Sequence, residues 1–534
     1  MGMKSNFKLG IILTSLEQPQ SSYDLIQWFE NNTDISVEYF LIDKVKRNTL
    51  AENLQTFQEL SWKLINFFEK IYYKKFHQKI CVHLLKPKIN HKIDYDLLKS
   101  CEFKKSKKFK KIQSSEIDLF FKFEFDIKLS TLAKASRYGI LSLSDLCLTQ
   151  NGNKFPIGFG EVFLSSGKTG FSLLHQHNQD PAIEVIYQGA FPTHNYYYAN
   201  KQNLIKRQNF YIKKNLSFFF NNHSFQNIYF KKNSLKNLPS VPNTLEQLQY
   251  IFKIFYRFFV KFLKKYFVKS SQWSVGFYRS DWNNFRFNDA EVIKNPNNCY
   301  LADPFIFTHN QKNYCFLEEY SFKNNLGSIC VYEIVDGDSI RIGNIIEESF
   351  HMSFPFIFTY EKKIYMLPET SANMDIRIYE SIEFPMKWRL KKVLMQDIFA
   401  VDSMIFFYNK LWWLFTNINP DNGTDACSDL FIFFATSPFS DEWSPHEMNP
   451  VIVDSDKARN AGILTNEGNL FRVSQKQKFD MYGGEFNINK INTLNPKIYD
   501  ESIDHIMTPA LVRGAKAYHH LHSNGKITVF DFFK

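Results

Sequence analysis

The C-terminal half of this 534-residue sequence repeats one β pattern five times. Each copy joins an apolar strand to a second, aromatic strand through a short polar turn, as in LADPFIFTHNQKNYCFLEE and MSFPFIFTYEKKIYMLPET. The copies follow one another after 51, 48, 58 and 48 residues, with equivalent positions at Asp303, Phe354, Asp402, Asn460 and Thr508. This spacing suits one four-stranded antiparallel blade per copy, and the β-branched and aromatic content excludes a helical solenoid. The sequence therefore predicts a five-bladed β-propeller.

Turn-forming residues separate the paired strands of the first four copies, at 310–313, 361–363, 408–410 and 466–469. Loops of this length and composition are typical of β-hairpins. The segment WSVGFYRSDW, which begins at Trp273, and the terminal ITVFDFF are expected to pair within the last blade. Such pairing closes the ring and leaves no exposed sheet edge.

The chain is long enough for two domains, each with its own core. In the N-terminal half, strand FKLGIILTS, helix SSYDLIQWFENN and strand VEYFLID alternate, and the pattern continues through DLFFKFEF, STLAKASRYG and ILSLSDL. This β-α-β order predicts an α/β domain with a parallel sheet. We expect the α/β domain at 1–235, a basic aromatic helical linker at 236–272 and the propeller at 273–534.

Composition and charge limit which binding partners and which cellular compartment are expected. The net charge of +11 lies largely in local lysine runs such as KKSKKFKK, which are typical of solvated loops, so nucleic-acid binding is not favoured. Seven scattered cysteines indicate a reducing compartment without structural zinc, and no metal site is expected. The N-terminal apolar run is too short for a signal peptide, and Lys or Arg interrupts the most apolar windows, so no transmembrane span and a cytoplasmic location are expected. The linker helix, at 248–269, is expected either to pack between the domains or to contact a membrane surface.

The segment from Tyr138 to Gly189 resembles the core of the formyltransferase-like domains. The pair Thr169-Gly170 matches a conserved T-G pair of that family, and Asp180 falls at the position of its catalytic Asp. The resemblance implies formyl-tetrahydrofolate as cofactor, with an Asn and a His stabilising the formyl oxyanion. Ser142 and Ser144 stand at the Asn and His positions, and a serine hydroxyl cannot replace an imidazole near neutral pH. The expected outcome is a retained fold with lost catalysis.

The propeller resembles the glycoside hydrolase family 43 type, in which inversion needs an Asp base, a Glu acid and an Asp that tunes the acid. Asp303, followed by Pro304, matches the base, and Asp402 matches the tuning residue. Blade four opens Arg459-Asn460-Ala461-Gly462, without the expected acid. The carboxylates left to reach the funnel are at the ends of second strands, Glu318, Glu319 and Glu369.

A second resemblance covers most of 273–531. The strings ADPFIF, NYCFLEE, SFPFIF, IYMLPETSAN, WWLF, ARNAG and HHLHSNG resemble the N-terminal propeller of the glucosamine inositolphosphorylceramide transferases. In bacterial relatives such a propeller follows a formyltransferase-like domain, and in plant relatives a separate glycosyltransferase domain follows the propeller. That transferase is expected to be absent here, because the sequence ends at Lys534.

Three hypotheses follow. The first is a protein of glycan or glycoconjugate biosynthesis whose funnel binds a sugar. Its catalytic or binding carboxylates would be Asp303, Asp402, Glu319 and Glu369, its other substrate-binding residues Arg459, Asn460, Gln475 and His519, and its stacking or packing aromatics Trp412, Trp413 and Tyr365. The second is a glycosidase with Asp303 as base. The third is a non-catalytic scaffold that presents the propeller to another protein.

Overall fold

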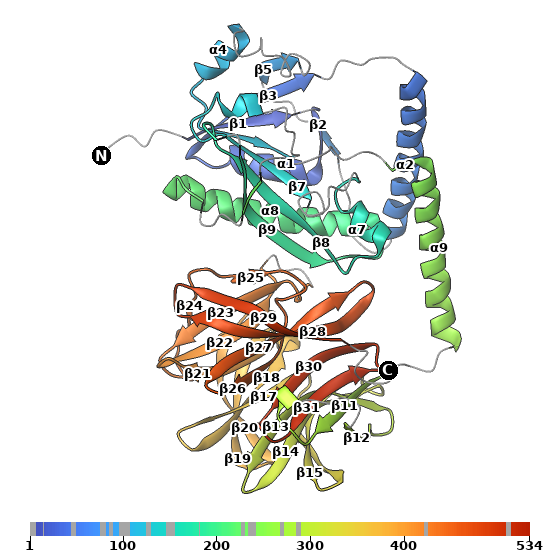
Figure 1. Cartoon of the computed structure of the whole chain (residues 1–534), viewed down its shortest axis with the longest axis vertical. Coiled ribbons are helices and arrows are strands. Elements are labelled where there is room, and N and C mark those ends of the chain that lie inside the picture. Colours follow the sequence, from blue (N-terminus) through green and yellow to red (C-terminus); the bar gives the residue numbers. More distant parts are fainter. Residues whose placement is uncertain are drawn as a thin grey trace. The chain divides into compact units, whose positions relative to one another are not determined.

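The computed structural model describes residues 7–13, 15–43, 50–74, 82–84, 89–94, 107–123, 130–145, 155–180, 182–225, 230–232, 242–267, 272–284, 290–420, 425–508 and 514–534. They divide into two compact units, Met1–Lys261 and Phe262–Lys534 (Figure 1). Cys299, Cys315, Cys330 and Cys427, the cysteines within the described residues, form no disulfides.

An eight-stranded mixed sheet forms the centre of the first unit, in the order β10-β9-β8-β7-β6-β1-β3-β5. The strands are β1 (Phe7–Leu13), β3 (Ile35–Asp43), β5 (Ile89–Asp94), β6 (Leu119–Lys122), β7 (Ile140–Asp145), β8 (Lys168–Gln176), β9 (Ile183–Pro192) and β10 (Phe230–Lys232). A separate two-stranded ribbon pairs β2 (Glu17–Pro19) with β4 (Val82–Leu84). The helices are α1 (Gln20–Glu30), α2 (Leu50–Lys74), α4 (Lys107–Gln113), α5 (Ser130–Ala133), α7 (Phe159–Leu164), α8 (Tyr197–Asn222) and α9 (Thr244–Phe267).

The predicted β-α-β start is confirmed, because β1 and β3 pair in parallel and α1 connects toward β3. The prediction of a parallel sheet is correct for β5-β3-β1-β6-β7 and wrong for β8, β9 and β10, which pair antiparallel with their neighbours. The connection 177–182 between β8 and β9 is too short for the crossover that a parallel pair requires.

The predicted linker helix exists as α9, whereas residues 236–241 and 268–271 of that linker lie outside the described residues. Its inner face packs on the first unit, where Tyr250 is buried beside Trp62, Phe159 and Tyr197. No helix among the described residues is long and apolar enough to cross a membrane.

Five antiparallel sheets make up the second unit, one per blade. Blade one contains β13 (Cys299–His309), β14 (Lys312–Ser321), β15 (Leu326–Val335) and β16 (Asp338–Ile346), and blade two contains β17 (Ser353–Tyr360), β18 (Lys363–Thr370), β19 (Asp375–Glu383) and β20 (Lys387–Gln396). Blade three contains β21 (Ala400–Tyr408), β22 (Leu411–Ile418), β23 (Asp429–Ala435), β24 (Ser444–Pro445) and β25 (Ile452–Val453). Blade four contains β26 (Asn460–Asn466), β27 (Asn469–Lys478), β28 (Met481–Leu494) and β29 (Tyr499–Met507). Blade five contains β30 (Ala517–Ser523), β31 (Thr528–Phe533), β11 (Trp273–Tyr278) and β12 (Glu291–Ile293).

The first strands of the blades, β13, β17, β21, β26 and β30, contact one another in a closed ring. The predicted five-bladed propeller is therefore confirmed. The four predicted hairpins are also confirmed, and each turns on two residues of positive φ, at 310–311, 361–362, 409–410 and 467–468. Two successive left-handed residues define the type I′ turn, whose twist matches that of the strands.

The predicted ring closure is confirmed as well. Strand β11 pairs antiparallel with β31 along its whole length, from Trp273 opposite Phe533 to Tyr278 opposite Thr528. Both ends of the propeller segment thus contribute to blade five, so neither presents a free edge at the closure.

The prediction for the fifth copy is wrong at its first strand. Thr508 follows β29, the outermost strand of blade four, and the innermost strand of blade five is β30, which carries the sequence AYHHLHS. His519, at the irregular pairing between Tyr518 and Leu521, is the structural equivalent of Asp303. The repeat pattern placed the first strand of copy five too early, because blade five takes its two inner strands from the C-terminal end of the propeller segment and its two outer strands from the N-terminal end.

Candidate functional site

Each of blades one, two and three interrupts its first strand with an irregular pairing near the propeller axis. The residues at these positions, Asp303, Phe354 and Asp402, have φ of 49°, 47° and 47°. A left-handed backbone is unfavourable for residues other than glycine and persists when the surrounding structure holds it. Here the backbone amides of these three residues donate to buried carboxylates of Asp531, Asp303 and Glu369.

A buried histidine connects two of these carboxylates. His519 Nε2 lies 3.1 Å from Asp303 Oδ1, and His519 Nδ1 lies 2.8 Å from Asp531 Oδ2. Asp531 also accepts hydrogen bonds from the backbone amides of Asp303, His519 and His520 at 3.0, 3.1 and 2.9 Å. Although burial lowers the pKa of His519, the Asp531 and Asp303 carboxylates outweigh it and raise this pKa well above its usual value. We therefore treat His519 as an imidazolium near neutral pH.

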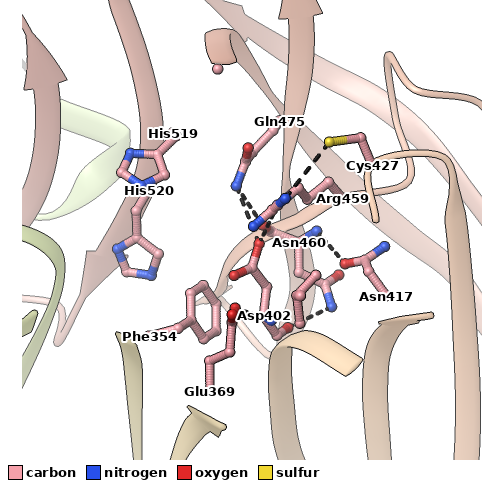
Figure 2. Close-up of polar contacts among 12 residues, drawn as sticks. Phe354, Glu369, Asp402, Asn417, Cys427, Arg459, Asn460, Gln475, His519 and His520 are labelled. Atoms are coloured by element: carbon pink, nitrogen blue, oxygen red, sulfur yellow. Dashed lines mark hydrogen bonds and ion pairs between the residues drawn. The ribbon is translucent and has the colours of Figure 1, made fainter. Parts of the chain in front are cut away.

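A second cluster surrounds Asp402 (Figure 2). Arg459 Nε donates to Asp402 Oδ2 at 2.6 Å, and Gln475 Nε2 approaches the same oxygen at 3.3 Å. Asn460 Nδ2 donates to the Asp402 carbonyl at 2.9 Å, and the Asn460 amide donates to Asn417 at 2.8 Å. Burial raises the pKa of Asp402 to about 8, although Arg459 opposes this shift.

These clusters border one cavity of about 210 Å³ at the propeller axis. Its lining residues come from four of the five blades and from the segments that lead into them: Trp273, Tyr300, Ala302, Asp303, Glu318, His351, Ser353, Glu369, Asp402, Arg459 and His519. Ligand pockets usually measure about 300–1,000 Å³, so this cavity lies below the small end of that range and suits a small polar ring.

Glu318 is the least constrained acid in this cavity. It is 5% exposed, and its Oε1 accepts no hydrogen bond from the described residues. His351 Nε2 lies 3.4 Å from that oxygen without forming a hydrogen bond. In blades two and three the equivalent residues, Glu369 and Asn417, accept the backbone amide of the next blade's first strand. In blade one Asp303 accepts that amide instead, which leaves Glu318 available to a ligand.

Burial and neighbouring charges shift the pKa values of Asp303 and Glu318 in opposite directions. Burial would raise the pKa of Asp303, but His519 outweighs burial and lowers it. Burial, together with the Asp303 carboxylate, raises the pKa of Glu318 well above its usual value. The cavity therefore presents an ionised carboxylate beside a neutral carboxylic acid, which accept and donate hydrogen bonds respectively.

Asp303, His519 and Asp531 also offer ligand atoms that lie within 4.8 Å of one another, a spacing that could hold a metal ion. Each ring nitrogen of His519, however, faces a carboxylate. A metal ion would therefore have to displace the proton that the two carboxylates favour on this ring.

The structure brings together six of the predicted propeller residues at the cavity wall: Asp303, Glu318, Glu369, Asp402, Arg459 and His519. Asn460 and Gln475 lie behind Asp402 as hydrogen-bonding supports. Glu319 does not reach the cavity, because neighbouring side chains of a strand alternate between its faces and Glu319 pairs with Arg341 at 3.0 Å. Trp412, Trp413 and Tyr365 belong to the hydrophobic core.

Sequence patterns missed four features of this wall: Trp273, Tyr300, His351 and the supporting role of Asp531. The Trp273 indole lies against the His519 ring, with ring centroids 4.0 Å apart and planes tilted by 47°. The signal for Asp531 was present, because ITVFDFF places one charged residue in a buried strand.

The predicted residues of the first unit are not brought together. Ser142 and Ser144 lie on β7, where Ser144 pairs with Ser172 of β8. Asp180 lies in the hairpin loop beyond the other end of β7, where Ile140 pairs with Gln176, and it accepts the amide of Ala182. Four residues of strand span about 13 Å, so Asp180 and Ser144 do not share a site.

Comparison with known proteins agrees with the propeller. Residues 286–525 match the family model described as the N-terminal region of glucosamine inositolphosphorylceramide transferase 1, which covers blades one to four and strands β12 and β30. The transferase of that name from Oryza sativa subsp. japonica is 33% identical over 248 residues, which are 43% of this chain and 33% of the relative. The one from Arabidopsis thaliana is 32% identical over 207 residues, 38% of this chain and 27% of the relative. The chain thus spans about a third of the length of these relatives.

Similar solved structures include the family 117 glycoside hydrolase Zg3597 of Zobellia galactanivorans, at 12% identity and a TM-score of 0.34 over 49% of this chain and 90% of that one. The catalytic domain of a family 62 α-L-arabinofuranosidase from Coprinopsis cinerea has 13% identity and a TM-score of 0.35 over 48% of this chain and 85% of that one.

Proposed function

We propose that the propeller binds one sugar unit of a glycoconjugate in the axial cavity, as part of glycoconjugate biosynthesis. The observation that carries this proposal is the cavity wall itself, which combines carboxyl groups, a guanidinium and two aromatic side chains. All of these residues except Trp273 lie inside the region related to the transferases. Sugar sites need a few convergent polar groups for hydroxyls and an apolar surface for the ring face. Glu318, Glu369 and Arg459 are suited to the hydroxyls, and Trp273 and Tyr300 to the ring.

The alternative is glycoside hydrolysis, and one observation favours it. A neutral Glu318 beside an ionised Asp303 is the kind of separation that acid and base pairs use. Asp303 is nevertheless poorly suited to be the base. Its Oδ1 faces His519, its Oδ2 accepts the Phe354 amide, and its lowered pKa makes it a weak proton acceptor. Binding is therefore the better-supported function.

For the first unit we propose a formyltransferase-like fold that has lost its catalysis. The five-stranded parallel core with an antiparallel extension supports such a fold, and the separation of Asp180 from Ser144 supports the loss. Calorimetry of the full chain with 5-formyl-tetrahydrofolate should show no heat of binding. Saturable heat would contradict this part of the proposal.

Saturation-transfer NMR on the full chain, with glucose, glucosamine, N-acetylglucosamine, mannose, arabinose and myo-inositol as probes, tests the binding proposal. We expect saturable transfer to at least one sugar. The same samples, incubated with p-nitrophenyl glycosides, test hydrolysis. Release of p-nitrophenol by the wild type, abolished in Asp303→Asn, would replace the binding proposal with a glycosidase.

A further inference from the structure

The first unit exposes an unusually large apolar surface on two helices. The exposed residues that form this outer helical face are Leu60, Leu64, Phe67, Phe68 and Ile71 of α2, and Leu245, Leu248, Phe252, Phe255, Tyr256 and Phe259 of α9. Their exposed fractions run from 48% for Ile71 to 72% for Phe252. The two helices lie side by side where they overlap (Figure 1).

Polar contacts fix the two helices to each other and to the unit behind them. Ser61 Oγ donates to Gln247 Oε1 at 2.6 Å, and Tyr250 OH donates to Glu69 Oε1 at 2.5 Å. The opposite sides of the helices carry Trp62 and Tyr250 into a buried aromatic cluster. The outer helical face is therefore held outward by a packed inner side and is not a loosely attached segment.

The spacing on this face is that of helix packing. On α9 the exposed positions 245, 248, 252, 255 and 259 alternate by three and four residues, and on α2 positions 60, 64, 67 and 71 do the same. Alternation by three and four is the seam that lets side chains of one helix fit between those of another. The same spacing marks any amphipathic helix, so the choice between a partner helix and a lipid surface rests on the charges and on the exposed area.

The two cations of α9 whose side chains the structure describes do not favour a membrane. Lys253 Nζ donates to the Phe163 carbonyl at 2.5 Å, and Arg257 donates to the carbonyls of Asn195 and Val162 at 2.6 and 3.0 Å. Both cations thus turn inward, although helices that lie on anionic lipids present their basic residues to the headgroups. Lys63 remains as an exposed cation at the border of the face on α2.

The exposed area matches what a stable dimer buries. Six of the residues are aromatic, and with about 200 Å² per side chain they alone expose about 750 Å². Patches on monomers reach about 300–600 Å², whereas each partner of a stable complex buries about 800 Å². With the leucines and Ile71 added, the outer helical face reaches the second value.

We propose that this face is the interface of a homodimer, in which α2 and α9 of two copies pack around a two-fold axis as a four-helix bundle. A two-fold interface uses the same patch on both copies, so a single self-complementary seam is sufficient. Bundles of this kind pack apolar seams with the three-and-four spacing seen here. The second copy would remove the exposed aromatic residues from water.

Light scattering coupled to size-exclusion chromatography of the full chain tests the proposal. One copy has a mass of 63.2 kDa, so the wild type should elute at about twice that mass. The double substitution Phe252→Asp with Phe255→Asp should reduce the mass to that of one copy, and circular dichroism should be unchanged because both side chains are exposed. Phe407→Asp, at a residue 58% exposed on β21, is the matched control and should leave the dimer intact.

A wild type that is monomeric across the concentrations tested would overturn the proposal. Flotation of that monomer with phosphatidylserine-containing vesicles would identify a lipid surface as the occupant instead. Failure to float would indicate that the chain covers the face itself. A dimer that survives the double substitution would also overturn it, by placing the interface elsewhere.

Discussion

Asp531 is the acceptor on which the closure of the propeller axis depends, so Asp531→Ala should strongly destabilise the propeller. The carboxylate is fully buried, and it accepts three backbone amides besides contacting His519. A buried donor left without its acceptor costs about 1–3 kcal/mol. Breaking a buried charged pair costs about 3–5 kcal/mol. These terms overlap, and we expect a loss of about 4 kcal/mol in the free energy of unfolding.

Urea unfolding of the full chain, followed by tryptophan fluorescence, measures this loss. Six of the eight tryptophans lie in the propeller, so the signal reports mainly that unit. Asp531→Asn, which keeps one oxygen, should lose less than Asp531→Ala. Asp336→Ala removes a fully exposed carboxylate 3.6 Å from Arg279 and should leave the free energy of unfolding almost unchanged, because solvent screens such pairs. An Asp531→Ala variant as stable as this control would refute the reasoning.

Two further predictions concern the same axis. Gly462→Ala should destabilise the propeller by about 3 kcal/mol in the same unfolding assay, because φ is +132° and the added Cβ would lie 2.1 Å from the Leu521 carbonyl oxygen. The control Gly468→Ala, whose added Cβ would have no atom within 4 Å, should cost about 1 kcal/mol. Equal losses in the two variants would contradict the close approach at Gly462. Because the pKa of His519 is raised in the folded state, its contribution to stability is full below the unfolded pKa of about 6.5 and is lost as the pH rises through the folded pKa. The free energy of unfolding of the wild type should therefore fall between pH 6 and pH 9, and it should fall less in His519→Gln. Parallel pH profiles of the two proteins would argue against an imidazolium at this position.

The sequence was most informative where the structure is local. Hairpin turns such as Asn310-Gln311 depend on a few adjacent residues, so their positions and the five-fold repeat could be predicted. The pairing of β11 with β31 could be predicted too, because one strand without an assigned partner was left at each end of the propeller segment. The fifth copy could not, since its strand order depends on how the ring closes and not on the local pattern.

The candidate site shows the same limit. Asp303 and Asp402 were found because they occupy equivalent repeat positions, and repeats converge at the axis. The choice between Glu318 and Glu319 could not be made from the sequence, since a shift of one residue moves a side chain to the other face of the sheet. The irregular pairing between Ala302 and Phe305 removes the simple alternation on which such a choice relies. In the first unit the resemblance located Asp180 and Ser144, but the antiparallel hairpin separates them.

The central claim is that a sugar binds at the propeller axis, and two neighbouring residues of β14 test it most directly. Saturation transfer to the best-bound sugar should be lost in Glu318→Leu, which removes the available carboxyl from the cavity wall and leaves no described hydrogen bond broken. It should be retained in Glu319→Gln, whose side chain pairs with Arg341 outside the cavity. Equal transfer in both variants, with tryptophan fluorescence showing both folded, would contradict the account.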